Sequence, residues 1–237
     1  MYGWRARLGV VIPAIILAVE PEFELMKPQG VSCHYHRFAF EGGGLDGLKA
    51  IETVVPEAAG MVSLVRPTAV AMCCTGGSFA GGYGYDQNLI AKMQQRNGNL
   101  PTTTASTSMI KALRALKVNS ISLAVPYIES IAMVEKQFIE DHGISVTKLQ
   151  YLGIDGWEMN QVPYETVYEL AKAANDPASE AVFISCVGLH TIGIIAALEQ
   201  DLQKPVITSN QVTMWNLLRL ADVNEPIYHY GQLLSEL

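Results

Sequence analysis

Short apolar runs, rich in valine and isoleucine, alternate along the chain with longer segments in which apolar residues recur at helical spacing. Such apolar runs are typical of strands buried on both faces of a parallel sheet. The expected strands are 8–12, 31–38, 68–72, 120–125, 145–152, 181–185 and 205–208. The expected helices are 47–61, 86–97, 107–116, 128–142, 164–174, 191–202 and 211–221. Strands that alternate with helices in this way predict an α/β fold.

The first apolar stretch has two interpretations. Leu8 to Val19 follows Arg5 and Arg7, which imitates the basic and apolar regions of a secretory signal. Pro13 interrupts the stretch, however, and its length of about 12 residues is short of the roughly 20 that cross a bilayer. We therefore expect a buried first strand that ends near Pro13, in a cytoplasmic protein that does not associate with membranes.

Composition narrows the function classes. Hydrophobic residues make up 49% of the chain and charged residues 16%, with a net charge of −7, which indicates a globular protein. Because lysine and arginine do not cluster, we expect no nucleic-acid partner. The cysteines at 33, 73, 74 and 186 are too few for a disulfide framework in a chain this long, so reduced thiols are expected. The absence of Cys-x-x-Cys pairs and His-rich tracts argues against a metal site.

The most informative feature is an internal repeat. Segment 69–77 resembles segment 181–189, because each is an apolar strand followed by cysteine and glycine. This echo predicts two similar lobes related by a pseudo-twofold axis, with Cys74 and Cys186 on opposite sides of one cleft. Ligands of open α/β sheets bind beyond the carboxyl ends of the strands. Cys73 points to the other side of its strand, and Cys33 lies outside the repeat, so both are expected to be structural.

The repeat also predicts chemistry. A helix N-terminus favours a reactive thiolate, and both cysteines are expected at such a position. Backbone N–H groups there can bind carboxylate oxygens and stabilise an enediolate. The expected binding groups are the backbone of Thr75, Gly76, Val187 and Gly188 and the hydroxyls of Thr75, Ser78 and Tyr127. The alternative is that the cysteines only fill the core, as buried cysteines commonly do.

Several motifs together resemble the aspartate/glutamate racemase superfamily, in the branch of maleate cis-trans isomerases and arylmalonate decarboxylases. They are Gly9 to Pro13 with Glu20-Pro21-Glu22, Cys74 to Phe79, Pro101 to Thr104, Pro126-Tyr127, Ser185-Cys186, Ser209-Asn210-Gln211 and Tyr230-Gly231. The resemblance implies two flavodoxin-like lobes with parallel sheets and the active site in the cleft between them. It implies no metal or organic cofactor, and it allows a homo-oligomer. We expect residues 1–115, completed by 209–237, to form one lobe and residues 116–208 the other.

The resemblance leaves more than one reaction open. Isomerases and racemases of this branch use a cysteine from each lobe, whereas the decarboxylases resemble this chain at Cys186 but carry glycine where it has Cys74. The resemblance places Pro13 beside the substrate. Maleate isomerases have an asparagine where this chain has Ile16. Ile16 and Trp157 either form an apolar substrate wall or simply pack into the core.

Three functions therefore remain. The first is an isomerase or racemase of a small carboxylic or dicarboxylic acid, most like maleate isomerase, in which Cys74 and Cys186 act as a pair. The second is an arylmalonate-type decarboxylase with Cys186 as the proton donor. The third is a binding protein for a small acid that performs no catalysis.

Overall fold

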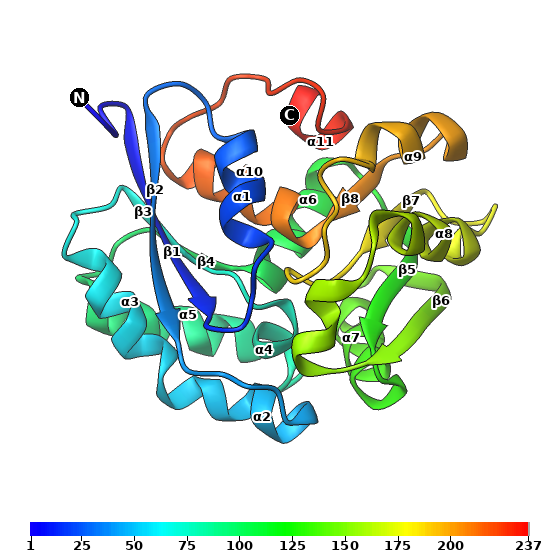
Figure 1. The fold of residues 1–237 in the computed structure, drawn as a ribbon, viewed down its shortest axis with the longest axis horizontal. Coiled ribbons are helices and arrows are strands. Elements are labelled where there is room, and N and C mark those ends of the chain that lie inside the picture. The colour runs from blue at the N-terminus through cyan, green and yellow to red at the C-terminus, as the bar shows by residue number, and fades with distance from the viewer. Residues whose placement is uncertain (237) are drawn as a thin grey trace.

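The computed structural model describes residues 1–236 and contains two four-stranded, all-parallel sheets. The first sheet consists of β1 (Ala6–Pro13), β2 (Val31–Phe38), β3 (Ala69–Met72) and β4 (Thr102–Thr104), in the order β2-β1-β3-β4. The second consists of β5 (Ser120–Tyr127), β6 (Ser145–Ile154), β7 (Ala181–Ile184) and β8 (Val206–Thr208), in the order β6-β5-β7-β8. The two sheets repeat one topology and lie in separate halves of the molecule (Figure 1). The prediction of two similar parallel sheets is confirmed.

The helices follow the strands along the chain. In the first half they are α1 (Val19–Met26), α2 (Gly44–Ala50), α3 (Val55–Ser63), α4 (Thr75–Phe79), α5 (Tyr85–Asn97) and α6 (Ala105–Ala115). In the second half they are α7 (Glu129–Asp141), α8 (Tyr164–Ala174), α9 (Ile195–Leu202), α10 (Ser209–Leu220) and α11 (Gln232–Glu236). Two 3₁₀ turns, η1 (Ile51–Thr53) and η2 (Gly156–Gln161), complete the set. Over residues 1–236, none of these helices is long and apolar enough to cross a membrane.

The signal-like stretch is a buried strand, as expected. Residues 8–13 of β1 are all buried, and β1 pairs with β2 on one side and β3 on the other. A strand in this position has neighbours on both edges and apolar layers on both faces, which accounts for its continuous hydrophobicity.

Some helix boundaries differ from the expectation. The segment 47–61 forms two helices separated by η1, because Pro56 has no backbone N–H to donate and so starts a new helix in the first turn of α3. The helix expected at 191–202 begins only at Ile195. The short elements α1, α11 and β4 were not expected from the pattern, whereas α4 begins directly after Cys74, where a helix N-terminus was expected. In α1 the apolar spacing is present, because Val19, Phe23 and Met26 are buried on one side of the helix.

The C-terminal part of the chain returns to its beginning. Helix α10 follows the second sheet but packs against α6, β3 and β4 of the first half. Beyond it, Glu225 pairs with Arg5 at 2.7 Å, and Gln211 Nε2 donates to the carbonyl of Tyr230. Leu237, the last residue of the segment 209–237, lies outside the described residues.

Candidate active site

The carboxyl ends of the two sheets face one pocket. Residues that follow β1, β2 and β3 form one side of it, and residues that follow β5, β6 and β7 form the other. The lining residues are Pro13, Ile15, Ile16, Phe40, Leu48, Cys74, Thr75, Gly76, Tyr127, Ile131, Asp155, Gly156, Met159, Cys186 and Val187. The cavity volume is about 40 Å³, which is room for a few water molecules.

Most of the residues expected from the sequence line this pocket. Both cysteines do, and so do Thr75, Gly76, Tyr127, Val187, Pro13 and Ile16. The structure therefore brings the two thiols to opposite walls of one cavity.

Cys74 lies where β3 ends and α4 begins. It is the N-cap residue of α4 and has an extended backbone, so the N–H groups of Thr75 and Gly76 open the first turn without an acceptor inside the helix. Gly77 allows the close packing of this turn. A Cβ atom there would lie 2.1 Å from Ile51 Cδ1 and 2.9 Å from Cys74 Sγ.

Cys186 lies in a different local structure. It follows β7, and the residues after it form turns rather than a helix, since α9 begins only at Ile195. The expectation of a helix N-terminus is therefore wrong for this cysteine. Its φ angle is 110°, a region that side chains with a Cβ rarely adopt. The backbone N–H of Gly188 donates to Cys186 Sγ at 3.3 Å. A strained backbone of this kind is typical of functional sites.

One serine links the two cysteine turns. Ser209 Oγ accepts a hydrogen bond from the backbone N–H of Cys186 at 3.0 Å and another from the hydroxyl of Thr75 at 2.9 Å. Ser209 is the first residue of α10, just after β8, and is 1% exposed. The sequence contained this residue within a motif but gave no sign that it connects both turns.

Replacement of Ser209 with alanine should therefore destabilise the fold. The N–H of Cys186 and the hydroxyl of Thr75 would lose their buried acceptor, which costs about 1–3 kcal/mol. Urea unfolding of the Ser209→Ala variant measures this loss. Ser235→Ala is the control, because its hydroxyl bonds to the Gln232 carbonyl in a part-buried turn near the end of the chain. Equal midpoints for the two variants would contradict the bridging role of Ser209.

Both thiols are neutral near pH 7. Burial raises the pKa of Cys74 to about 12, and the Gly77 N–H only partly opposes this. Burial raises the pKa of Cys186 to about 11, although the N–H of Gly188 and the hydroxyl of Tyr127 act to lower it. The helix N-terminus was expected to favour the thiolate, but the pKa of each thiol is raised, because desolvation outweighs the backbone donors. Since each thiolate would also repel the other, the pocket favours at most one charge.

The candidate hydroxyls have different roles. The hydroxyls of Thr75 and Ser78 already form hydrogen bonds within the protein. The Thr75 hydroxyl donates to Ser209, and the Ser78 hydroxyl bonds to the Thr75 carbonyl and to the hydroxyl of Ser106. Ser78 does not line the pocket. The hydroxyl of Tyr127 lies next to the side chains of Cys186 and Ser185, at the wall of the cavity. Tyr127 is thus the predicted hydroxyl that remains available to a ligand.

Trp157 does not form the wall that the sequence suggested. Its side chain is 46% exposed and it is not among the lining residues, because η2 turns it outward. Nearby, Asn160 is buried, and its amide bonds the backbone of Ile15, Leu17 and Trp157. Asn160 therefore holds two segments of the pocket rim together.

The apolar wall has other members, which the sequence did not single out. Ile15, Phe40, Leu48, Ile131 and Met159 line the pocket with Ile16. They lie on separate strand ends and helices, so no local spacing connects them. Cys186 Sγ lies 3.6 Å from the sulfur of Met159. These side chains suit an apolar substituent on the ligand.

The charged group at the rim is already paired. Asp155 accepts hydrogen bonds from the backbone N–H of Gly44 at 3.0 Å and of Gly156 at 2.8 Å. The bond to Gly44 joins α2 to the loop after β6 across the pocket mouth. Among the described residues that line the pocket, none is lysine, arginine or histidine, so a bound carboxylate has to rely on N–H and hydroxyl donors.

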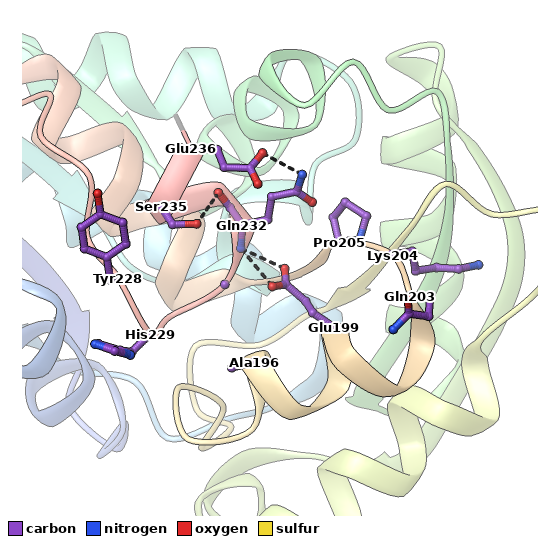
Figure 2. Close-up of a pocket in the computed structure, with 11 residues that line it drawn as sticks. Ala196, Glu199, Gln203, Lys204, Pro205, Tyr228, His229, Gln232, Ser235 and Glu236 are labelled. Atoms are coloured by element: carbon purple, nitrogen blue, oxygen red, sulfur yellow. Dashed lines mark hydrogen bonds between the residues drawn. The ribbon is translucent and has the colours of Figure 1, made fainter.

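A larger hollow lies elsewhere, between α9 and the C-terminal segment, and it is open to solvent (Figure 2). Its central carboxylate, Glu199, accepts from the backbone N–H groups of Val206 and Gln232. Gln232 in turn bonds to Glu236. These groups hold α11 in place, and the hollow contains no cysteine.

The other candidate groups lie outside the pocket. Cys73 is fully buried and Cys33 is partly buried on β2, and neither is a lining residue. Within residues 1–236 no cluster of histidine, cysteine, aspartate and glutamate side chains has the arrangement of a metal site.

Comparisons with known proteins agree with this geometry. A family model described as arylmalonate decarboxylase matches residues 8–234. Arylmalonate decarboxylase of Bordetella bronchiseptica is 30% identical over 235 residues, covering 94% of this chain and 97% of its own. The structure of maleate isomerase Iso from Pseudomonas putida S16 superposes with a TM-score of 0.92 at 20% identity, covering 97% of this chain and 98% of that one.

A liganded arylmalonate decarboxylase variant superposes with a TM-score of 0.91 at 28% identity, covering 98% of this chain and 99% of that one. In that variant a glycine is replaced by cysteine and a cysteine by serine. The match of the family model over almost the whole length and the shared two-sheet architecture lead to one conclusion: this chain belongs to the arylmalonate decarboxylase family.

Proposed function

We propose that this protein is a cofactor-independent isomerase or racemase that moves a proton at the carbon next to a carboxylate, with Cys74 and Cys186 on opposite faces of the substrate. The observation that carries the proposal is the position of both thiols on one pocket. The substrate class is a small acid with one carboxylate at the backbone donors and an apolar substituent against Ile15, Ile16 and Met159.

In this mechanism one cysteine, as the thiolate, removes the α-proton, and the other, as the thiol, delivers a proton to the opposite face. The negative charge moves from sulfur to the carboxylate, which becomes an enediolate, and then to the second sulfur. The N–H groups of Thr75 and Gly76 stabilise the enediolate, and one such donor contributes about 3 kcal/mol. The raised pKa of each thiol makes it a proton donor at neutral pH and a strong base once ionised.

The proposal assigns one cysteine to each lobe. Residues 1–115 with 209–237 make up the lobe of Cys74, and residues 116–208 make up the lobe of Cys186. The packing of α10 on α6, β3 and β4 supports this division.

A second candidate is decarboxylation of a substituted malonate, with Cys186 as the proton donor. The apolar wall favours it, because a carboxylate held against apolar side chains is destabilised and its loss as neutral carbon dioxide is favoured. The same wall disfavours maleate, whose second carboxylate would be buried without a donor.

Proton NMR in deuterium oxide tests both candidates in one format. The panel contains maleate, phenylmalonate and both enantiomers of 2-phenylpropionate. We expect loss of the α-proton signal of 2-phenylpropionate together with loss of optical activity. If phenylmalonate released carbon dioxide while the α-proton of 2-phenylpropionate did not exchange, the protein would be a decarboxylase, and the first candidate would be contradicted. Binding of these acids with no turnover of any would indicate a binding protein and contradict both.

Exchange of Ile16 for asparagine should alter substrate preference. The amide would add a donor to the apolar wall, so a second carboxylate would gain a partner and an apolar substituent would lose contacts. We expect the ratio of kcat/KM for maleate over 2-phenylpropionate to rise at least tenfold, about the effect of one changed group in a pocket. Leu17→Asn is the matched control, because Leu17 is 44% exposed and does not line the pocket. A ratio that changes equally in both variants would contradict the role of Ile16.

A further inference from the structure

A buried acid lies directly behind the second cysteine, outside the pocket. Glu135 on α7 has no exposed surface, and its Oε1 accepts a hydrogen bond from the hydroxyl of Ser185 at 2.5 Å. Ser185 immediately precedes Cys186 in the chain. The second carboxyl oxygen of Glu135 is buried without a hydrogen-bond partner among the described residues. An unpaired buried carboxyl oxygen is costly, so its retention calls for an explanation.

The hydroxyl of Tyr127 is the group that could link Ser185 to the sulfur of Cys186. Tyr127 and Cys186 both line the pocket, and the side chains of Ser185 and Cys186 both act on the pKa of the Tyr127 hydroxyl. The groups therefore follow one another in the order Glu135, Ser185, Tyr127 and Cys186. Both middle members are hydroxyls, which accept one proton while they donate another.

We propose that Glu135 is the proton acceptor that converts Cys186 to its thiolate, through the hydroxyls of Ser185 and Tyr127. The thiol proton passes to Tyr127 Oη, the proton of Tyr127 passes to Ser185 Oγ, and the proton of Ser185 passes to the carboxylate of Glu135. The net change is a thiol and a carboxylate becoming a thiolate and a carboxylic acid. One negative charge is conserved and moves from the buried acid to the sulfur at the substrate. Glu135 is thus a positioning residue that acts through Cys186.

Electrostatics support a single shared charge. Burial raises the pKa of Glu135 to about 8, although the hydrogen bond from Ser185 acts to lower it. An ionised Glu135 in turn raises the pKa of Cys186, because two negative charges would face each other in a dry interior. Charging both groups is therefore less favourable than charging one, so the two titrations are coupled.

Other titratable groups lie too far toward the surface to share this role. The elements packed against α7 are β5, β6, α2 and α4. Their titratable side chains are Tyr127 on β5, Lys148 and Tyr151 on β6, and Asp46 and Lys49 on α2. Apart from Tyr127, these side chains are exposed. On α7 itself, Lys136 pairs with Glu140 at 2.9 Å. Tyr127 and Cys186 are thus the titratable groups that interact with the buried acid.

The first experiment needs no substrate. Alkylation of Cys186 by iodoacetamide is followed against pH by mass spectrometry of its peptide, and Cys74 in the same samples is the internal control. In the wild type we expect the Cys186 rate to rise with pH and to flatten above about pH 8, where Glu135 ionises. In Glu135→Gln the rate should continue to rise above pH 8 toward the pKa of the thiol itself, which is lower than in the wild type because no ionised Glu135 raises it. The same profile in both proteins would overturn the shared charge.

The second experiment measures turnover and rests on the proposed function. Glu135→Gln should lower kcat at least tenfold, since positioned proton transfer contributes about 10²–10⁴-fold, while its Cys186 alkylates as fast as the wild type or faster. Ser185→Ala should lower kcat similarly, because it removes a hydroxyl from the proposed proton path while the carboxyl group of Glu135 remains. Glu129→Gln, an exposed change on α7, is the matched control.

The outcomes separate the possible failures. A Glu135→Gln protein that loses both turnover and alkylation, with a lowered Tm, would indicate a structural role and overturn the relay. Normal turnover in Glu135→Gln would overturn it as well. If the wild type turned over no acid in the panel, the proposed function would fail, and the alkylation profile would still decide whether Glu135 and Cys186 share one charge.

Discussion

Replacement of Cys186 with serine is expected to lower turnover of any substrate by about 10³-fold or more, since loss of one member of a catalytic unit removes most of its effect. Under isomerisation this cysteine serves one face of the substrate, and under decarboxylation it is the proton donor. Serine has nearly the same size but a much less acidic hydroxyl. The N–H donors at Thr75 and Gly76 remain, so substrate binding should change much less than kcat.

Replacement of Cys74 with glycine distinguishes the two reactions. If the thiols act as a pair, Cys74→Gly should lower racemisation by about 10²-fold or more, because one face loses its acid and base. If the protein is a decarboxylase, Cys74→Gly should keep carbon dioxide release within a few-fold of the wild type. Single-turnover NMR in deuterium oxide shows which face of the product carries deuterium in each variant.

Cys33→Ser is the control for both changes, because Cys33 lies on β2 away from the pocket. Near-normal kcat in both Cys186→Ser and Cys74→Gly would contradict the two-thiol mechanism. A loss in Cys33→Ser as large as in the pocket variants would mean that the measurement reports folding rather than chemistry.

The sheets and the two cysteines could be predicted because their signals are local. A strand such as Ala181–Ile184, buried on every residue, has to be apolar throughout, and the following cysteine and glycine are adjacent in sequence. The repeat around Cys74 then placed both thiols at equivalent strand ends. Parallel strands end at the same edge, so their common pocket followed from topology.

The rest of the site could not be predicted, because its contacts join distant parts of the chain. Phe40, Leu48 and Met159 form a wall only once the segment after β2 and the segment after β6 come together, as the bond between Gly44 and Asp155 shows. The pairing of Ser209 with Cys186 depends on α10, which returns from the second sheet to the first. The thiol pKa values depend on burial, which a motif does not report. For that reason the helix N-terminus at Cys74 did not predict the raised pKa of its thiol, and Cys186 has no helix N-terminus beside it.

The carboxylate of Glu22 is another buried acid that joins distant segments. It is 2% exposed and belongs to α1. Its oxygens accept from the backbone N–H groups of Thr191 and Ile192, at 2.5 and 2.9 Å, and from the amide of Asn210 at 2.7 Å. Asn210 also donates to the carbonyl of Val187, beside Cys186. Glu22 therefore fixes the turn that follows the second cysteine.

Glu22→Ala should consequently lower the free energy of unfolding by at least about 3 kcal/mol, because several buried donors lose their acceptor at once and each costs about 1–3 kcal/mol. Glu22→Gln should lose less, since it keeps one acceptor oxygen and the shape of the side chain. Urea unfolding measures both. Glu24→Ala on the same helix is the control: Glu24 pairs with Lys27 at the surface, and such pairs contribute about 0–1 kcal/mol. The turn should also loosen, so Cys186 should alkylate faster in Glu22→Ala than in Glu24→Ala. Equal stability and equal alkylation in these two variants would show that the donors find other partners, and the turn at Cys186 would then owe its strained backbone to β7 and Ser209 alone.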